Sequence, residues 1–240
     1  MSIKIAHITD LHLDEAFPHQ HGIQTRKRFD RILNEITKEE IDEIVCTGDI
    51  SENGGLPYFF EQLKSQSLYI TLGNHDTFDQ VSAFYNHGAD YRTQKMYSSK
   101  IGDHYKYLFL DSSSGLLDYK QLSWLKKELF TLKPIIIFMH HPIMKLNLKI
   151  DEVGGTTNGE EILALLTDIE NNVTIFCGHY HMESMIVHKN VTQYITPAVS
   201  YLVEKIPDKI KINSTKFGYR MIELSKNEIS SRVKLFKDAD

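Results

Sequence analysis

The sequence predicts an α/β fold in which helices cover both faces of a partly parallel sheet. Short apolar segments with strand character alternate with segments whose apolar residues recur at helical spacing. The run "IIIF" at 135–138 is typical of a strand that is buried on both faces, as parallel strands are. The chain has 240 residues, 41% of them hydrophobic, which is enough to bury a large core. We therefore expect a single domain over residues 1–240.

The first half of the chain shows the alternation of strands and helices most clearly. In the segment 24–37, Phe29, Ile32 and Ile36 recur at the spacing of one helix face. The apolar run Leu68–Leu72 is too short for a helix and ends at a glycine, as strands often do. We expect strands at 3–9, 44–46 and 68–72, and helices at 24–37, 58–64 and 79–86.

The second half is richer in strands. Asn158, with Glu161 three residues later, matches a capping box at the start of a helix. After residue 182, apolar segments are separated by short polar turns, which indicates hairpins. We expect strands at 96–98, 105–111, 134–139 and 173–177, helices at 119–129 and 160–169, and hairpins at 186–195 and 221–235.

Charge and cysteine usage limit the partners and the compartment. The 27 Lys and Arg residues against 32 Asp and Glu give a net charge of −5, whereas general nucleic-acid binders show a basic face. No secretion signal is recognisable at the N-terminus, and no stretch approaches the ~18 consecutive apolar residues of a membrane span. Cys46 and Cys177 each end an apolar run, which indicates that both thiols are buried. Buried thiols that form no disulfide are typical of a reducing compartment. We expect a cytoplasmic protein without long nucleic acid or membrane as partner.

Five of the predicted strands end in polar residues that commonly bind metals. These residues are Asp10, His12, Asp49, Asn74, His140, His179 and His181. Because the carboxyl ends of strands in an α/β sheet share one edge, we expect their side chains to meet in one crevice. Nitrogen and oxygen donors without cysteine suit ions such as Mn, Fe, Zn or Co, whereas structural zinc sites are typically rich in cysteine.

The number of donors indicates more than one ion. Seven side chains are too many for one tetrahedral ion, whereas two ions that share a carboxylate would use them all. The spacing leaves open whether the pairs Asp10/His12 and His179/His181 each embrace one ion or straddle two. Two ions ~3.5–4 Å apart suit phosphate chemistry, because they lower the pKa of a bound water and neutralise charge on the phosphoryl oxygens.

The motifs D-x-H at 10–12, G-D at 48–49, G-N-H-D at 73–76, the strand-terminal His140 and G-H-x-H at 178–181 follow one another in a characteristic order. In this order they resemble the calcineurin-like metallophosphoesterases. The chain is most similar to the bacterial class III 3′,5′-cyclic nucleotide phosphodiesterases in "GDISENGGLPYF", "MHHP", "NGEEILALL" and "ITPAVSYLVEK". The resemblance implies a four-layer α/β/β/α sandwich of two mixed sheets flanked by helices.

The resemblance also implies roles for the polar residues. Asp10, His12, Asp49 and His181 would hold the first of two divalent or mixed-valence ions, and Asn74, His140 and His179 would complete the second, to which Asp49 bridges. His75 would stay free of metal and protonate the leaving oxygen, and Asp76 would orient its imidazole. The identity of the metals, among Mn, Fe, Zn and Co, is left open.

The implied activity is that of a dinuclear metal-dependent phosphodiesterase. A hydroxide that bridges the two metals would attack a small phosphodiester, such as a 3′,5′-cyclic nucleotide, while His75 acts as the acid. The alternatives are a phosphomonoesterase or nucleotide pyrophosphatase of the same fold, and a non-catalytic interaction module. Such a module would be expected to lack some ligands, yet every expected position is filled. The segment 196–217, apolar and basic, is a candidate homodimer contact.

Other polar residues have simpler interpretations. His7, within the first strand, is expected to be packed and hydrogen-bonded. Arg26, Lys27 and Arg28 on the first long helix are expected to form its solvated face. His141 beside His140 is as consistent with a supporting role at the metals as with a structural one.

Overall fold

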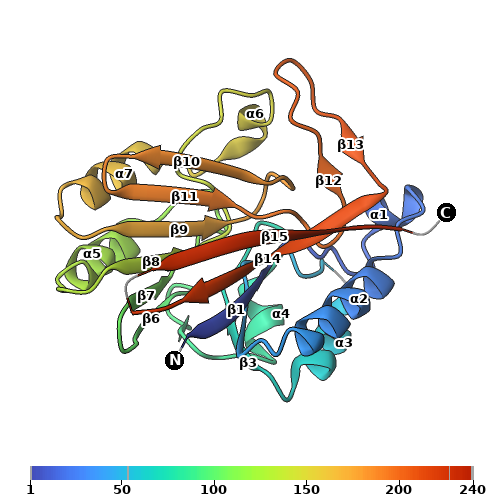
Figure 1. Ribbon diagram of the computed structural model, residues 1–240, viewed down its shortest axis with the longest axis horizontal. Coiled ribbons are helices and arrows are strands. Elements are labelled where there is room, and N and C mark those ends of the chain that lie inside the picture. The colour runs from blue at the N-terminus through green and yellow to red at the C-terminus, as the bar shows by residue number, and fades with distance from the viewer. Residues whose placement is uncertain (1, 53, 227, 239–240) are drawn as a thin grey trace.

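Two mixed β-sheets pack face to face in the computed structural model, which describes residues 2–52, 54–226 and 228–238 (Figure 1). The first sheet contains β1 (Ile3–Ile8), β2 (Glu43–Cys46), β3 (Ser67–Ile70), β14 (Lys216–Leu224) and β15 (Ile229–Lys237), in the order β15-β14-β1-β2-β3. The first three strands are parallel, and β14 and β15 add antiparallel pairs.

The second sheet has six strands. They are β6 (Ser98–Ile101), β7 (Lys106–Phe109), β8 (Ile135–Phe138), β9 (Val173–Cys177), β10 (Ser184–His188) and β11 (Val191–Ile195), in the order β10-β11-β9-β8-β7-β6. The four inner strands are parallel, and the edge strands β6 and β10 are antiparallel to their neighbours. Both hairpins expected near the C-terminus are therefore confirmed as β10–β11 and β14–β15.

Helices form the two outer layers. The larger ones are α2 (Thr25–Lys38), α3 (Gly55–Leu63), α5 (Tyr119–Glu128) and α7 (Gly159–Thr167). Phe29 of α2 and Phe59 of α3 share a buried cluster with strands of the first sheet, whereas Leu125 and Ile162 share one with the second. The expected four-layer architecture is confirmed (Figure 1).

Short elements complete the described chain. They are α1 (Ala16–Gln20), α4 (Phe78–Ser82), α6 (Asp151–Gly154), the pair β4 (Ala89–Asp90) and β5 (Lys95–Met96), and the pair β12 (Leu202–Val203) and β13 (Ile212–Asn213). Segments as short as α1, α6 and the β12–β13 pair show no periodicity, so the sequence does not predict them. Among the described residues, no helix has both the length and the apolar character that crossing a membrane requires.

A ladder of aromatic rings fills the space between the two sheets. Phe109, Phe138, Phe176 and Tyr194 lie in register on four neighbouring strands. Their ring centroids are 5.6, 5.5 and 5.3 Å apart from one neighbour to the next, and the rings are stacked. Each such pair contributes ~0.5–1.5 kcal/mol beyond the burial of its area. The ladder fixes the parallel strands whose ends carry the candidate site.

Two predictions about polar residues are wrong. Asn158 does not cap its helix, because its carboxamide pairs with the backbone of Leu117: Oδ1 accepts from N–H at 3.1 Å and Nδ2 donates to the carbonyl at 2.8 Å. Arg28 is buried instead of solvated and donates to the carbonyls of Ser200 and Ser214 and to Asp238. It ties α2 to the C-terminal part of the chain.

The prediction for His7 is confirmed. Its ring is fully buried, Nε2 lies 2.8 Å from Thr47 Oγ1, and Nδ1 lies 2.7 Å from Thr196 Oγ1. Two hydroxyls therefore satisfy both ring nitrogens, and burial with a nearby Arg220 holds the pKa of His7 at about 3. His7 is a neutral structural residue of β1.

Candidate metal centre

The candidate site is built from the loops that follow β1, β2, β3, β8 and β9. Hydrogen bonds between backbone groups join these loops directly. The N–H of Asp10 donates to the carbonyl of Gly48 at 3.0 Å, that of His12 to Asp49 at 2.9 Å, and that of Gly178 to His140 at 2.9 Å. Two further bonds link the remaining loops: the N–H of His75 donates to Oδ1 of Asp49 at 2.9 Å, and that of His179 donates to Oδ2 of Asp10 at 3.1 Å. The five strand ends therefore converge at one edge of the two sheets.

Five of the expected ligands have a left-handed backbone. Their φ values are 55° at Asp10, 47° at His12, 51° at Asp49, 66° at His179 and 50° at His181. This region costs roughly 1–3 kcal/mol for a residue with a side chain and persists where the surrounding structure enforces it. The sharp turns direct successive side chains of D-x-H and G-H-x-H to the same centre instead of opposite faces of a strand.

Close packing at the strand ends requires glycine. A Cβ atom at Gly178 would lie 2.1 Å from Thr9 Oγ1 and 2.6 Å from Asp10 Oδ2. A Cβ atom at Gly73 would lie 2.2 Å from Asp49 Oδ1. The glycines of G-H-x-H and G-N-H-D thus let the backbone approach the two buried carboxylates.

The first cluster of donor atoms lies between the loops after β1 and β9. Nε2 of His12 is 3.2 Å from Nε2 of His181, and Nε2 of His181 is 3.3 Å from Oδ1 of Asp10. Oδ2 of Asp49 is 3.7 Å from Nε2 of His12. These are the four residues expected at the first ion.

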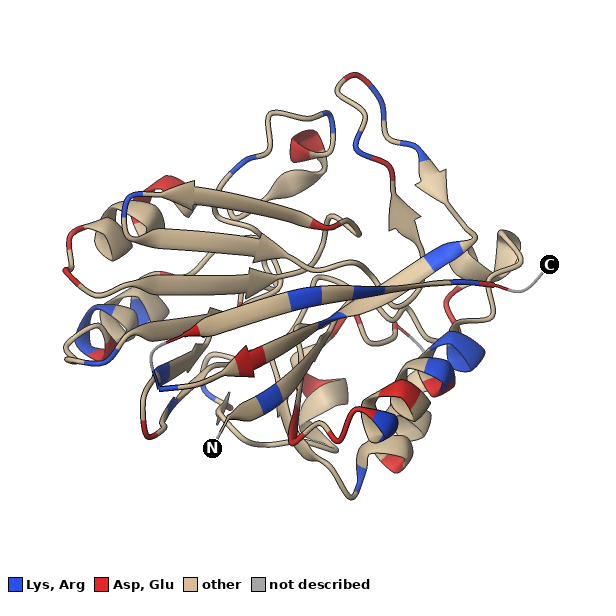
Figure 2. Cartoon of the chain, in the orientation of Figure 1, with Lys and Arg blue, Asp and Glu red and all other residues tan. Residues whose placement is uncertain are grey.

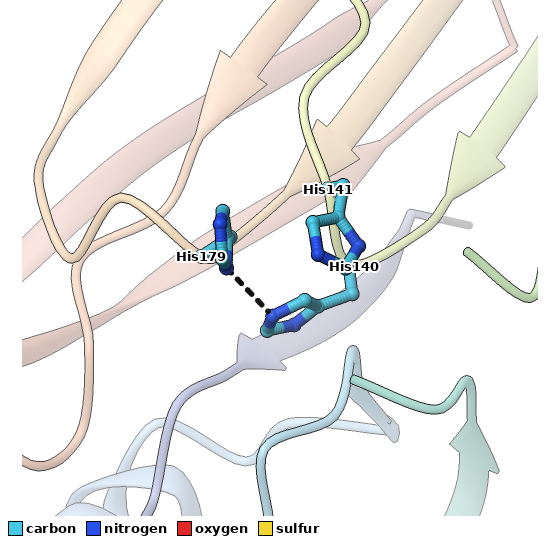
Figure 3. Close-up of side chains that lie close together, drawn as sticks. All are labelled: His140, His141 and His179. Atoms are coloured by element: carbon cyan, nitrogen blue, oxygen red, sulfur yellow. Dashed lines mark hydrogen bonds between the residues drawn. The ribbon is translucent and has the colours of Figure 1, made fainter. Parts of the chain in front are cut away.

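The second cluster surrounds His140. Its Nε2 atom lies 3.2 Å from Nδ1 of His179, 3.2 Å from Oδ1 of Asn74 and 3.3 Å from Oδ2 of Asp49. Figure 3 shows the rings of His140 and His179 with these nitrogens facing each other. The four residues are those expected at the second ion, and Oδ2 of Asp49 is common to both clusters.

Most neighbouring donor atoms in the two clusters have the spacing of ligands around one ion, and only the 3.7 Å between Asp49 and His12 is longer. Two ligands ~2.1 Å from a common metal, at right or tetrahedral angles, are ~3.0–3.4 Å apart. Nε2 of His12 lies 3.2 Å from Nε2 of His181, and Nε2 of His140 lies 3.2 Å from Nδ1 of His179. Both distances fall in this range. The residues therefore fit two ions that share Asp49.

Hydrogen bonds fix the orientation of the histidine rings. Nδ1 of His140 donates to the carbonyl of Thr47 at 2.8 Å, and Nδ1 of His181 donates to that of Tyr201 at 3.0 Å. A carbonyl only accepts, so both Nδ1 atoms carry hydrogen and Nε2 presents a lone pair to the cluster in the neutral ring. The rings are therefore held in the tautomer that binds metal through Nε2.

Asp10 and Asp49 are buried carboxylates, and their ionised form is stable only with positive charge nearby. Burial opposes the ionised form of Asp10 and Asp49, yet His181 and His140, respectively, hold the pKa of these groups below its ordinary value. Burial likewise opposes the charged form of His140, but Asp49 raises its pKa to about 9. Bound cations would supply the same compensation for the two carboxylates.

His75 belongs to neither cluster. Its ring is half-buried, and Nδ1 lies 2.7 Å from Oε1 of Glu52 and 3.2 Å from Oε2 of Glu15. The contact with Glu15 is the largest cause that raises the pKa of His75 to about 9, and burial opposes it. The ring lies edge to face with that of His12, with centroids 4.7 Å apart. His75 is thus an imidazole beside the clusters.

The expected pairing of Asp76 with His75 is wrong. The carboxylate of Asp76 accepts the backbone N–H groups of Asp49 at 2.7 Å, Ile50 at 2.9 Å and Gly73 at 2.9 Å. Three backbone donors occupy this carboxylate, whereas the carboxylates beside the His75 ring are those of Glu15 and Glu52. Asp76 instead braces the loops that present Asp49 and Asn74.

Glu15 is a site carboxylate that is not among the residues expected from the sequence. It is almost completely buried, its Oε2 accepts from Nδ1 of His12 at 2.9 Å, and the same oxygen lies 3.2 Å from Nδ1 of His75. Burial opposes ionisation, but His12 and His75 lower the pKa of Glu15 to about 2. The only signal in the sequence for this role is that Glu15 follows His12 by three residues, in a loop whose polar composition predicts exposure to solvent.

His141 has a supporting place. Nδ1 of His141 lies 3.1 Å from Oγ of Ser112. The backbone N–H of His141 donates to the same oxygen at 3.0 Å. Burial lowers the pKa of His141 to about 2, so the ring is neutral. Its centroid lies 4.3 Å from that of His179, and Figure 3 shows the two rings beside His140. His141 therefore packs against two of the expected ligands.

A cavity of about 200 Å³ lies over the clusters. Its polar lining includes His12, Asp49, Asn74, His75, His179 and His181. The remaining lining comes from α6 with Ile150 before it, and from the segment 201–212. The cavity gives a small ligand access to both clusters and to His75.

Comparisons with known proteins match the chain to a family. The sequence profile described as "Calcineurin-like phosphoesterase" matches residues 3–183. A Fibrobacter succinogenes protein named "Probable cyclic nucleotide phosphodiesterase" is 26% identical over 238 residues, which cover 96% of this chain and 93% of the relative. A glycerophosphodiester phosphodiesterase of Enterobacter lignolyticus is 27% identical over 224 residues, covering 83% of this chain and 78% of that protein.

Among solved structures, a dimetal phosphatase of Danio rerio has the same fold. It superposes with a TM-score of 0.69 at 12% sequence identity, covering 95% of this chain and 98% of the other. This superposition shows the fold, and the family rests on the sequence profile.

Proposed function

Because the chain belongs to the calcineurin-like phosphoesterase family, we propose that this phosphodiesterase hydrolyses small phosphodiesters, with 3′,5′-cyclic nucleotides as the leading substrate class. The observation that carries the proposal is the pair of donor clusters that share Oδ2 of Asp49. Relatives named for cyclic nucleotides and for glycerophosphodiesters support the substrate class.

We assign seven side chains to two metal ions. Asp10, His12, Asp49 and His181 hold the first ion, and Asn74, His140 and His179 complete the second together with Asp49. When bound, two such ions supply Lewis acidity at the phosphoryl oxygens and lower the pKa of water. Mixed nitrogen and oxygen donors accommodate Mn, Fe, Zn or Co.

His75 is assigned as the general acid. It lines the cavity that the clusters share, yet it belongs to neither of them. The departing alkoxide of an unactivated diester is a poor leaving group, so a proton delivered by a positioned imidazole lowers the barrier to bond cleavage. Glu15 and Glu52 stand beside Nδ1 and hold the ring in place.

The compartment and the partners form part of the proposal. Free, buried Cys46 and Cys177 support a cytoplasmic location, since reducing compartments keep thiols unpaired. Lys and Arg are mixed with Asp and Glu along α2 (Figure 2), and the net charge of the chain is −5, which supports a small-molecule substrate over long nucleic acid. The homodimer contact at 196–217 stays a prediction.

A substrate panel tests the proposed function. The metal-free protein is reconstituted with Mn²⁺, Zn²⁺ or Co²⁺, and kcat/KM is measured for 3′,5′- and 2′,3′-cyclic nucleotides, glycerophosphodiesters, dinucleotide pyrophosphates and phosphomonoesters. We expect diesters to be preferred and 3′,5′-cyclic nucleotides to lead among them. A clear preference for monoesters or pyrophosphates would establish the alternative substrate classes instead.

A further inference from the structure

One wall of the cavity is apolar, although its floor is made of metal ligands. The wall consists of Val153 in α6, Tyr201, and Val203, Ile210 and Ile212 around the β12–β13 hairpin. Val153 is 56% exposed and Ile210 is 43% exposed. Large aliphatic side chains with this exposure stand directly beside a strongly polar centre.

The wall is fixed relative to the first cluster. The N–H of Val203 donates to the carbonyl of His181 at 2.8 Å, and Nδ1 of His181 donates in return to the carbonyl of Tyr201 at 3.0 Å. At the other end of the hairpin, the N–H of Lys149 donates to the carbonyl of Pro207 at 2.9 Å. The hairpin is thus bonded both to a metal ligand and to the segment that leads into α6.

An aromatic face continues the wall. The ring of Tyr201 lies 4.4 Å from that of His181 and 5.4 Å from that of Phe17, centroid to centroid. Phe17 is 40% exposed and lies 4.3 Å from the ring of His21. A ring that entered the cavity would therefore meet both aliphatic and aromatic surface next to the first cluster.

The chemistry of this wall discriminates between ester groups. A glycerol moiety is a flexible polyol, and it would lose hydration against aliphatic side chains without a hydrogen bond in return. A flat heterocycle gains from burying its faces and stacks on aromatic side chains. We infer that Val153, Tyr201, Ile210 and Ile212 form a subsite for the nucleobase of a nucleotide diester. This inference rests on the proposed function and narrows it to one substrate class.

Two chromogenic esters with the same leaving group test the subsite. The 4-nitrophenyl ester of thymidine 5′-phosphate carries a nucleoside, whereas methyl 4-nitrophenyl phosphate does not. We expect the metal-loaded protein to prefer the nucleoside ester in kcat/KM on the order of tenfold or more, as differential contacts with an apolar pocket allow. Ile210→Ser is expected to reduce this preference about fivefold, measured as the ratio of kcat/KM for the nucleoside ester to kcat/KM for the methyl ester. The matched control is Ile101→Ser, which changes an isoleucine that is 74% exposed on β6.

A third ester separates a flat ring from a chain. Hexyl 4-nitrophenyl phosphate offers apolar surface without a ring. A preference for the hexyl ester over the nucleoside ester would overturn the assignment of a nucleobase. Equal kcat/KM for the methyl and nucleoside esters, or a preference that Ile210→Ser leaves intact, would overturn the subsite itself.

Methyl NMR tests the subsite without catalysis. In Zn²⁺-loaded protein with labelled isoleucine δ1-methyl groups, thymidine 5′-monophosphate is expected to shift the signals of Ile210 and Ile212, and glycerol 3-phosphate is not. The signal of Ile101 reports non-specific effects. If neither the thymidine nor the methyl 4-nitrophenyl ester is hydrolysed, the proposed function fails. The NMR result still decides whether the apolar wall binds a base. Equal responses to the two monoesters would reject the subsite.

Discussion

Nε2 of His140 and Nδ1 of His179 face each other 3.2 Å apart (Figure 3), although Nδ1 of His140 already donates to a carbonyl. Two neutral rings satisfy this contact only if His179 donates, and Nε2 of His179, on its far side, is buried without a hydrogen-bond partner among the described residues. A cation between the facing nitrogens uses both lone pairs. The contact therefore fits a ligand pair of a metal site.

Metal removal is the first prediction. A chelator is expected to abolish hydrolysis and lower the midpoint of thermal unfolding, because bound ions stabilise the native state by ~2.7 kcal/mol at a free concentration 100 times Kd. Differential scanning fluorimetry with and without Mn²⁺ measures the shift. Asp49→Ala, which lacks the shared carboxylate, should no longer respond to Mn²⁺. Identical unfolding curves for the native protein with metal and with chelator would contradict the prediction.

His75→Ala tests the acid. Without the imidazole, kcat/KM for an alkyl diester should fall ~10²–10⁴-fold, whereas a 4-nitrophenyl ester should lose far less because nitrophenolate leaves without a proton. The two losses are compared at constant metal occupancy. His104→Ala, at an exposed position in the turn before β7, serves as the matched control. Equal losses on both esters would argue against proton delivery by His75.

Glu15→Gln tests a carboxylate that contacts both His12 and His75. The amide oxygen can still accept from Nδ1 of His12, but its charge is gone. We expect metal affinity to fall ~10–100-fold, as for other hydrogen-bond partners of ligand histidines. Calorimetric titration of the metal-free protein measures it. Asp14→Asn removes the neighbouring charge, which pairs with Arg26, and should bind metal normally. If both variants bind metal equally well, Glu15 does not position His12.

Gly178→Ala tests the close approach of two strand ends. The added Cβ would meet Thr9 Oγ1 and Asp10 Oδ2 at distances that no side chain tolerates without movement. Overpacking of this kind typically lowers the free energy of unfolding by about 1–3 kcal/mol, and displacement of Asp10 should weaken metal binding too. Urea denaturation measures the loss. Gly54→Ala, with no atom within 4 Å of its Cβ, is the control. An unchanged stability would show that the loop adapts freely.

The sequence was sufficient for the parts of the site that depend on strand ends. Each expected ligand follows a parallel strand by one to a few residues, so the topology alone carries Asp10, Asn74 and His140 to one edge. The motifs also contain the turns that aim the side chains. This is why the two clusters agree with the residues expected from the D-x-H, G-N-H-D and G-H-x-H patterns.

The contacts of His75 could not be predicted from the sequence. Adjacency suggested Asp76 as its partner, but backbone N–H groups in two tight turns take up that carboxylate. Glu15 and Glu52 reach His75 from different loops, a contact that no periodicity encodes. The apolar wall could not be predicted either, because the β12 and β13 strands are two residues long and show no periodicity. Arg28 was misjudged because its carbonyl partners lie more than a hundred residues away in the chain.

Anomalous scattering from crystals of the Mn²⁺-loaded protein tests the central claim most directly. Two peaks per chain are predicted, ~3.5–4 Å apart as in two-metal sites, one beside His12 and His181 and the other beside His140 and His179, with Asp49 in reach of both. A map with no peak at these residues, or with ions bound only elsewhere, would contradict the account.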